Sequence, residues 1–299
     1  MGQKDIAEKT LEAYNDVFAD IVNVLLFNGT RTVKEKDLED ETPRSCLKID
    51  GKLHEQERDV AKFWKNSNIR IALYGLENQT EPDVDMPLRI SSYDGAAYKE
   101  QLLNDERKER YPVVTLVLYF GSKHWNKPKT LYERLTISDE LKPFVSDHKA
   151  NIFEISFLSQ NQVNLFKSDF KIVADYFVQL RTKKNYVPSN SIIKHVTEVL
   201  RLLRILTGDD RFTPDAKLIN SKGKSVTMCE VLDRIENRGI EKGIEKGIEK
   251  GIEKGIEKGK ISAFAELVKD GILTLKQAAE RMGMSVAKFK AAMKEVATN

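Results

Sequence analysis

The sequence ERDVAKFWKNSNIRIALYGLENQTEPDVDMPLRISSY, residues 57–93, decides the fold. Its centre, residues 69–76, is apolar and β-branched, which is typical of a strand that is buried on at least one face. Residues 58–65 can form the strand before it, and residues 66–68, Asn-Ser-Asn, supply turn residues between the two. We therefore expect a β-hairpin at the centre of the protein.

Two acids and an amide stand at one end of this hairpin. Glu77 and Gln79 follow the second strand, and they share a face because alternate strand residues point the same way. A hairpin that places Trp64 near Ile71 brings Asp59 level with Glu77. The resulting oxygen-rich pocket would suit Mg²⁺ or Mn²⁺. Such an ion polarises a phosphoryl oxygen and activates a bound water. A solvated strand end is the alternative.

An amphipathic helix is expected next, over residues 86–106, with Pro82 and Pro87 flanking its start. Its inward face would carry Met86, Ile90, Tyr93, Ala97 and Leu102. Two roles fit Arg89 near its beginning. Arg89 could clamp a phosphate at the mouth of the pocket, or it could pair with Asp85 one turn back.

The order of these residues resembles a known family, the recombination-promoting nuclease (Rpn, or YhgA-like transposase) branch of the PD-(D/E)xK nucleases. The resemblance extends over roughly residues 10–260. The matching residues are, in order, Asp59, Leu76-Glu77-Asn78-Gln79-Thr80, Asp83-Val84-Asp85-Met86-Pro87, Arg89, Tyr93, Tyr111-Pro112-Val113-Val114, Leu118-Tyr119-Phe120-Gly121 and Trp125.

The resemblance implies an α/β fold with a restriction-endonuclease-like core in the order αβββαβ. It also implies a Mg²⁺-dependent DNA endonuclease, with Asp59 and Glu77 as catalytic metal ligands and Gln79 placing the attacking water. Asp16 belongs to a segment, Tyr14-Asn15-Asp16-Val17-Phe18, that is similar to the family's leading motif. Asp16 is thereby implied as a further metal ligand, or Asp85 takes the auxiliary role in its place, and an ordinary exposed acid is the alternative for Asp16.

Two departures from the family pattern, and one from the wider superfamily, leave a second function open. Arg58 stands where the family has Pro, Thr80 where it has Ser, and Gln79 where most of the superfamily has Lys. An amide can orient water but cannot offer a positive charge to the developing transition state. The alternative is therefore a catalytically weak or inactive protein that binds DNA or oligomerises on a nuclease fold. A transposase in the full sense would also need strand transfer.

Other core elements are expected on either side of the hairpin. A helix should run from about residue 5 to residue 27 and end at Asn28-Gly29. Residues 30–44 are mostly charged or turn-forming, so a loop is expected there. Asp50-Gly51 should form the tip of a second hairpin. Residues 113–120 should form a buried central strand, parallel to another, and residues 151–158 a further strand.

A lysine-rich loop follows the central strand at residues 121–129. Lys123 and Lys127 are candidates for contact with a DNA backbone, a role that the mixture of lysines with the aromatic Trp125 suits. A solvated loop with Trp125 turned inward explains the composition equally well.

Composition bounds the class of protein. The chain has 299 residues, 32% of them charged, and a net charge of +3 that neither proves nor forbids a nucleic-acid partner. Cys46 and Cys229, its two cysteines, form no disulfide or zinc signature and fit a reducing compartment. The first residues do not form a signal peptide. No apolar run reaches the roughly 20 residues of a membrane span. We expect a cytoplasmic protein that does not bind membranes.

The C-terminal part reads as helical. After a nuclease-like core over residues 1–160, we expect a helical subdomain at 161–238, with helices at 166–180 and 192–206. The sequence Gly-Ile-Glu-Lys then recurs five times within residues 239–260. Each glycine in a helix interior costs roughly 1 kcal/mol relative to alanine. This region therefore either self-associates, making the protein a homo-oligomer, or forms a frayed spacer.

A small helical tail is expected at residues 261–299, with short helices at 263–269 and 275–282. Ala278-Ala279 and Gly283-Met284-Ser285 before a final helix resemble a helix-turn-helix in which Ser285 caps that helix. Lys288, Lys290 and Lys294 could then contact DNA. The alternative is a helical clip that packs on a partner subunit.

Overall fold

The structure is a computed structural model of the chain. It describes residues 10–41, 44–49, 52–57, 60–74, 80–103, 109–184, 186–214 and 226–297. These residues form two compact units, Met1–Val231 and Leu232–Asn299, and each is described by itself.

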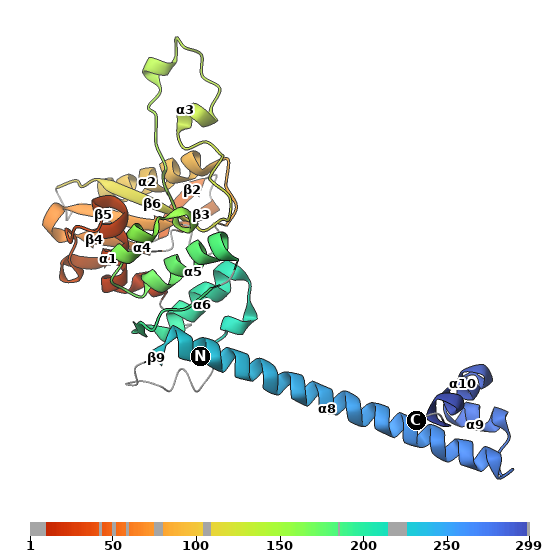
Figure 1. The fold of residues 1–299 in the computed structure, drawn as a ribbon. Helices are drawn as coiled ribbons and strands as arrows, with labels where there is room; N and C mark the ends of the chain where they lie inside the picture. Colours follow the sequence, from red (N-terminus) through yellow and green to blue (C-terminus); the bar gives the residue numbers. More distant parts are fainter. Residues whose placement is uncertain are drawn as a thin grey trace, which may run out of the picture. The chain divides into compact units, whose positions relative to one another are not determined.

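A five-stranded sheet forms the centre of the first unit (Figure 1). The strands β1, β4 and β5 are antiparallel neighbours, whereas β5, β6 and β7 are parallel. This mixed α/β sheet agrees with the predicted class, and the buried strand expected at residues 113–120 is its parallel β6. In spatial order the strands are β1 (Leu38–Glu41), β4 (Val60–Trp64), β5 (Ile69–Tyr74), β6 (Val113–Tyr119) and β7 (Asn151–Glu154).

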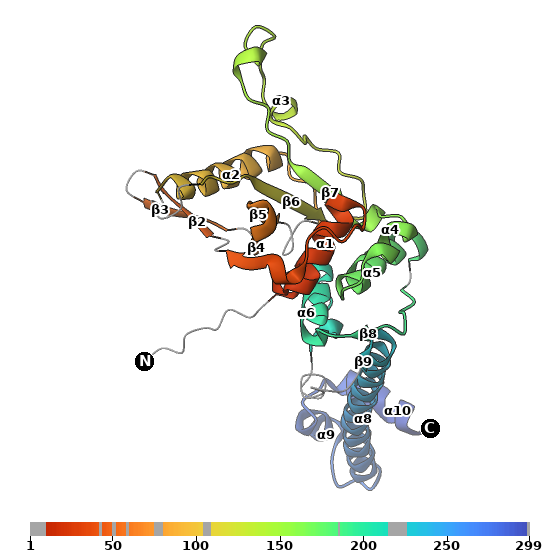
Figure 2. The same cartoon turned by 90° about the vertical axis from the view of Figure 1, so that its left-hand side faces the viewer.

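Helices cover both faces of this sheet. Figure 2 shows α1 (Asn15–Phe27) on one face and α2 (Met86–Leu103) on the other. Phe18 and Ile21 of α1 and Met86 and Ile90 of α2 are buried against it, and each such side chain contributes about 1.5–3 kcal/mol by leaving water. Leu102, expected to face inward, is 67% exposed because it lies in the last turn of α2. Along the chain, α1, β1, β4, β5, α2 and β6 follow in the order αβββαβ, with a separate ribbon inserted after β1.

The loop of the hairpin between β4 and β5 is two residues shorter than expected. Trp64 pairs with Ile69 rather than lying opposite Ile71. The cause is the turn: Lys65–Ser67 form a single 3-10 turn, and Asn68 takes the left-handed conformation with φ 50°. Asparagine tolerates that region better than most residues, so β5 can begin at once.

The charged segment at residues 30–44 is not only a loop. Residues Leu38–Glu41 form the edge strand β1 and pair with β4. Lys62 of β4, whose side chain is buried, forms an ion pair with Asp40 across the two strands. Asn23 of α1 holds the chain before β1, because its amide oxygen accepts the N–H of Val33 at 2.8 Å. Charged side chains are characteristic of edge strands, where they oppose further pairing.

The first helix is shorter than expected. Residues Leu11–Ala13 form a 3-10 turn, Tyr14 is extended, and α1 begins at Asn15. The helix ends as predicted at Asn28 and Gly29, both with positive φ. The second predicted hairpin is present as the ribbon β2 (Arg44–Ile49) and β3 (Lys52–Glu57), whose tip lies outside the described residues.

Gln101 joins the end of α2 to the start of β6. Its amide nitrogen donates to the carbonyl oxygen of Tyr111 at 3.0 Å, and its amide oxygen accepts the N–H of Tyr111 at 2.9 Å. The Gln101 side chain is buried. Because a buried amide that satisfies both backbone groups of its partner is costly to remove, this contact fixes where the crossover returns to the sheet.

Short helices complete the first unit. The segment between β6 and β7 holds α3 (Leu131–Arg134) and projects from the sheet in Figures 1 and 2. The strand expected at 151–158 ends at Glu154 and continues as a 3-10 turn. The two predicted helices start about one turn late, as α5 (Phe170–Lys183) and α6 (Val196–Thr207). Also present are α4 (Gln160–Leu165), β8 (Ile192–Ile193) and β9 (Val226–Thr227).

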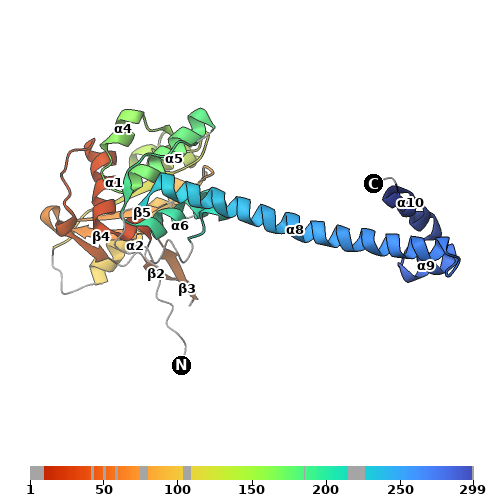
Figure 3. The same ribbon diagram turned by 60° about the horizontal axis from the view of Figure 1, so that its bottom comes forward.

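One helix of 42 residues, α8 (Met228–Lys269), covers the four-residue repeat. The separate helix expected at residues 263–269 is the end of α8. It is followed by α9 (Leu275–Arg281) and α10 (Val286–Ala297), which lie at the C-terminal end of α8 in Figure 3. Across the described part of the chain, no helix combines the length and the apolar character that crossing a membrane requires.

Candidate active site

The strand ends that border the two predicted acidic segments lie at one edge of the sheet. Val60, the first residue of β4, pairs with Leu73 near the end of β5. Asp59 directly precedes Val60, and Glu77 and Gln79 lie between Tyr74 and Thr80. These three residues fall outside the part of the chain that the structure describes. The described chain nevertheless borders on both gaps at the same sheet edge, where parallel β6 also ends.

Thr80, the first described residue after Gln79, lies against the end of β6. A Cβ atom added to Gly121 would come within 2.5 Å of the Thr80 carbonyl oxygen and would collide with the ring of Tyr119. Only glycine therefore allows this close approach of the two backbones. The residues just after Gln79 are thus held at the carboxyl edge of the parallel strands.

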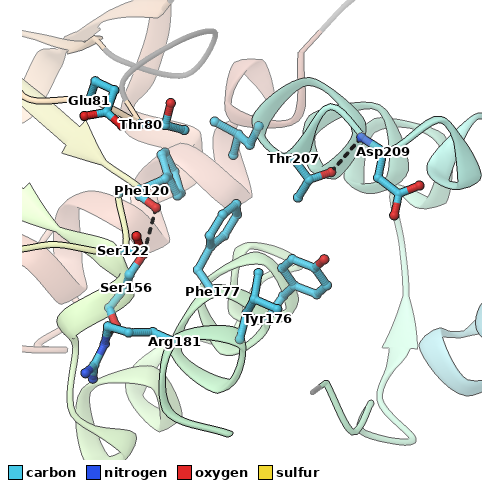
Figure 4. A pocket seen from close by; sticks show the side chains of 13 residues that line it. Thr80, Glu81, Phe120, Ser122, Ser156, Tyr176, Phe177, Arg181, Thr207 and Asp209 are labelled. Atoms are coloured by element: carbon cyan, nitrogen blue, oxygen red, sulfur yellow. Dashed lines mark hydrogen bonds between the residues drawn. The ribbon is translucent and has the colours of Figure 1, made fainter. Parts of the chain in front are cut away.

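A pocket with a volume of about 430 Å³ opens at this edge (Figure 4). Thr80, Glu81 and Ser122 line it from the sheet, and Arg181 of α5 and Asp209 beyond α6 line it from the helices. Ligands of open α/β sheets bind outside the carboxyl ends of the strands. The pocket therefore has the position expected of an active site.

Arg181 brings a positive charge to the helical wall of this pocket. Its Nε donates to the carbonyl oxygen of Ser156 at 2.7 Å, and its guanidinium lies 4.4 Å from the centre of the Phe157 ring. Two fixed contacts hold a planar group that can bind phosphate oxygens in pairs. Sequence reasoning missed Arg181, because a cation in the last turn of a helix looks like an ordinary solvated residue.

Two acids lie near Tyr119 at the same edge. Burial, with the charges of Glu81 and Glu154, raises the pKa of the Tyr119 phenol. Glu154, at the end of β7, accepts the N–H of Trp125 and lies 3.3 Å from Nδ1 of His124. Within the described residues no three His, Cys, Asp or Glu side chains are grouped so that they could hold a metal ion.

Asp16 is engaged by residues from a distant part of the chain. Its carboxylate lies 2.6 Å from Nζ of Lys194 and 3.5 Å from Nε2 of His195. Partial burial opposes ionisation of Asp16, but Lys194 and His195 outweigh it and lower its pKa. The His195 ring also stacks on Tyr14 at 3.7 Å. Asp16 thus connects α1 to the segment that leads into α6.

The cluster around Asp16 lies at the other end of the strands from the pocket. The side chain of Asn15 donates to the carbonyl oxygen of Leu38 at 3.1 Å, and Leu38 pairs with Trp64 at the far end of β4. Asp59, in contrast, precedes the first residue of β4. The contacts of Asp16 give no support to its predicted place in a metal site with Asp59.

The three residues predicted to contact DNA, Arg89, Lys123 and Lys127, lie on two different segments. Arg89 is half exposed, and its Nε lies 2.9 Å from Asp83, whereas Asp85 lies 2.6 Å from Arg134. Lys123 is exposed on the segment after β6, as is Lys127.

Of the two roles considered for Trp125, packing is the one present. Its side chain is 6% exposed and meets the Tyr119 ring edge-on at 5.2 Å. Met86 and Ile90 of α2 belong to the same buried cluster. The ring therefore anchors the lysine-bearing segment to the core.

A comparison with protein-family models finds a match to this chain. The model of a family described as "Putative transposase, YhgA-like" matches residues 33–205, more than half of the 299-residue chain. No curated protein and no solved structure matches. The matched range contains the whole sheet, the pocket's sheet wall and Arg181.

Proposed function

This chain belongs to the YhgA-like transposase family, and we propose that it is a metal-dependent DNA endonuclease that hydrolyses phosphodiester bonds at the carboxyl edge of its sheet. The observation that carries the proposal is that the start of β4 and the end of β5, which border the two acidic segments, lie together at that edge, next to the pocket of Figure 4. The αβββαβ order of elements is the order expected of a PD-(D/E)xK core.

The donor set fits a hard divalent cation. Asp59 and Glu77 would supply carboxylate oxygens and Gln79 an amide oxygen, the ligand types that Mg²⁺ or Mn²⁺ prefers. When bound, the ion would supply positive charge to the phosphoryl group. Gln79 can orient the attacking water through its carbonyl oxygen. Since Gln79 brings no charge, Arg181 on the opposite wall is proposed to contact the phosphate.

DNA would reach the pocket across exposed cations. Lys123 and Lys127 lie on the segment that follows Gly121, itself part of the pocket wall. Arg89 lies at the start of α2, shortly after Thr80. Contacts of this kind bind the phosphate backbone without reading sequence, and they weaken as salt rises.

Plasmid nicking tests the proposal. Supercoiled DNA and Mg²⁺ are incubated with the wild-type chain, with Asp59→Ala and with the matched control Asp147→Ala, which removes an acid that does not line the pocket. We expect nicking by the wild type and the control, and loss of nicking by about 10²-fold or more in Asp59→Ala, as for other removed catalytic groups. Equal nicking by all three would reject the assignment.

A second candidate is a non-catalytic DNA-binding or assembly protein on the same fold, because Gln79 stands where most of the superfamily has Lys and Arg58 stands where the family has Pro. Calorimetric titration with Mg²⁺ and Mn²⁺ separates the two. The nuclease proposal requires metal binding that Asp59→Ala abolishes, whereas no uptake of either ion by the wild type would favour the alternative. Strand transfer, which a transposase also performs, would be tested by an assay that detects joined DNA products.

Self-association through α8 in the cytoplasm is proposed together with this function. Five isoleucines of the repeat are between 53% and 58% exposed within the described structure: Ile240, Ile244, Ile248, Ile252 and Ile256. A Cβ atom added to any glycine of the repeat would meet nothing within 4 Å. A second copy of α8 could cover the isoleucine row and approach closely along the glycine row.

A further inference from the structure

The C-terminal end of α8 packs with α9 and α10 into a three-helix cluster (Figure 3). Ile261 of α8, Ala278 and Ala279 of α9, and Phe289 of α10 are buried together. The two alanines bring little bulk to the contact, so α9 can lie close to both neighbouring helices. Thr274 caps the start of α9. Its hydroxyl oxygen accepts the backbone N–H of Gln277, and the Gln277 side chain accepts the backbone N–H of Thr274.

The turn between α9 and α10 is short and specific. Gly283 has φ 67°, a conformation that favours glycine. Two residues later, Ser285 accepts the N–H of Lys288 at 3.3 Å and caps α10, as the sequence predicted. A short helix, a glycine turn and a capped second helix on a third supporting helix form the helix-turn-helix arrangement.

The outer face of α10 combines small residues with flanking lysines. Phe289 is fully buried, so the helical period places Ala287 and Ala291 on the opposite face, with Lys288 and Lys290 on its two flanks. All four of these outer residues are exposed. Small side chains at the centre would let the helix approach the floor of a groove, while cations on the flanks could reach phosphates on either side.

We propose that α10 is the recognition helix of a second DNA-binding site and lies in the major groove of duplex DNA. This site would be separate from the proposed nuclease site and would need no metal. Lys288 and Lys290 would contact phosphates, and Ala287 and Ala291 would approach base edges, where alanine can contact a thymine methyl group.

The composition of this face favours DNA over a protein partner. Interface cores that bind proteins are enriched in aromatic residues and depleted of lysine. The apolar side chains on the outer face of α10 are those of Ala287 and Ala291, because the helical period places Val286, which is 42% exposed, on the side nearer Phe289. Glu295 is the acid on this helix, and it lies near the C-terminal end. Recognition helices contact bases mainly through their N-terminal residues.

The test measures DNA affinity in the full chain without cleavage. All proteins carry Asp59→Ala and are kept in EDTA, so binding is measured independently of nuclease activity. Anisotropy of a labelled duplex is followed over a series of salt concentrations for the parent, for Lys288→Ala/Lys290→Ala and for Ala287→Glu/Ala291→Glu. The control Lys246→Ala/Lys250→Ala removes the same charge from exposed positions of α8.

The α10 variants should bind about tenfold more weakly than the control at low salt. For the lysine pair, the slope of log affinity against log salt should also fall by about 1.8, because each lost phosphate contact contributes about 0.9. Circular dichroism checks that the helices remain folded. Equal affinity and slope in the lysine pair and its α8 control would overturn the proposal.

A crosslinking experiment does not depend on affinity. A photo-crosslinking amino acid is placed at position 291 or, for comparison, at position 250 of the full chain. We expect adducts with duplex DNA from position 291 and few from position 250. Protein–protein adducts from position 291 without DNA adducts would show that this face binds a second chain, and would also reject the proposal.

Discussion

The backbone at Gly121 lies so close to Thr80 that a Cβ atom there would come within 2.5 Å of the Thr80 carbonyl oxygen. This contact joins the end of the central strand β6 to the segment that follows Gln79. The position of the chain directly after the proposed catalytic amide therefore depends on a residue without a side chain.

Gly121→Ala should lower both stability and activity. Because the neighbouring atoms include backbone, they cannot rotate away, and overpacking of this kind costs about 1–3 kcal/mol. We expect a lower denaturant midpoint and a larger relative loss in plasmid nicking. The control is Gly95→Ala in α2, where an added Cβ atom meets nothing within 4 Å. This control should raise the free energy of unfolding by about 1 kcal/mol. Unchanged nicking by Gly121→Ala would contradict the predicted coupling.

The loop after β6 should separate packing from DNA contact. Trp125→Ala should lower the free energy of unfolding by about 3–5 kcal/mol, because it empties a buried site. Lys123→Ala/Lys127→Ala should leave stability within about 0.5 kcal/mol and should weaken DNA binding with a smaller salt slope. Urea unfolding and anisotropy titrations measure the two effects, and DNA affinity unaffected by the lysine pair would remove this loop from the proposed DNA path.

Asp169 should give the protein an acid-dependent stability. Its carboxylate accepts the backbone N–H of His195 at 2.6 Å and of Lys194 at 3.0 Å. Burial nevertheless raises its pKa above the ordinary value of 3.8. A raised folded pKa stabilises the folded state at low pH, and this contribution is lost as pH rises through the folded value.

The wild type should therefore gain stability relative to Asp169→Asn when pH falls from about 7 toward about 4. Urea unfolding across that range measures the difference. Asp139→Asn, at a side chain that is 90% exposed, is the control. A wild-type advantage that shrinks on acidification would show the opposite sign and contradict the raised pKa.

Replacing glycines of the repeat tests the proposed role of α8. Gly247→Ala/Gly251→Ala adds methyl groups that meet nothing within 4 Å of the chain. Each should stabilise the helix by about 1 kcal/mol, which a thermal melt followed by circular dichroism would detect. If copies of α8 pack along the glycine row, the same variant should dissociate at higher protein concentration in sedimentation. A variant that is more helical but equally associated would exclude close packing there.

The sequence predicts those parts of the fold that depend on local signals. The hairpin of β4 and β5, parallel β6 and helix α2 follow from apolar runs, turn residues and prolines. Strand β1 could not be found in this way, because residues Leu38–Glu41 are mostly acidic and become a strand only through the open edge of β4. The hairpin register was missed because it depends on the conformation of Asn68, which its residue type alone does not settle.

In the candidate site, too, local sequence signals predict some features and tertiary packing determines the others. The order of acids along the chain places Asp59 and Glu77 at strand ends, and the structure places those strand ends at one edge. Arg181 could not be predicted, because only the packing of α5 brings it to the pocket. Nor could the pairing of Asp16 with Lys194, which are 178 positions apart. The predicted metal ligands themselves stay predictions.

The reciprocal contact between Gln101 and Tyr111 has a consequence for engineering this protein. The buried amide of Gln101 holds the end of α2 against the start of β6, so the peptide between them is not needed to align the two elements. In a circular permutant, new termini would be opened between positions 103 and 109 and the original ends would be joined to each other. The sheet should still assemble. The crossover would then serve as an attachment point for a reporter or a second catalytic domain.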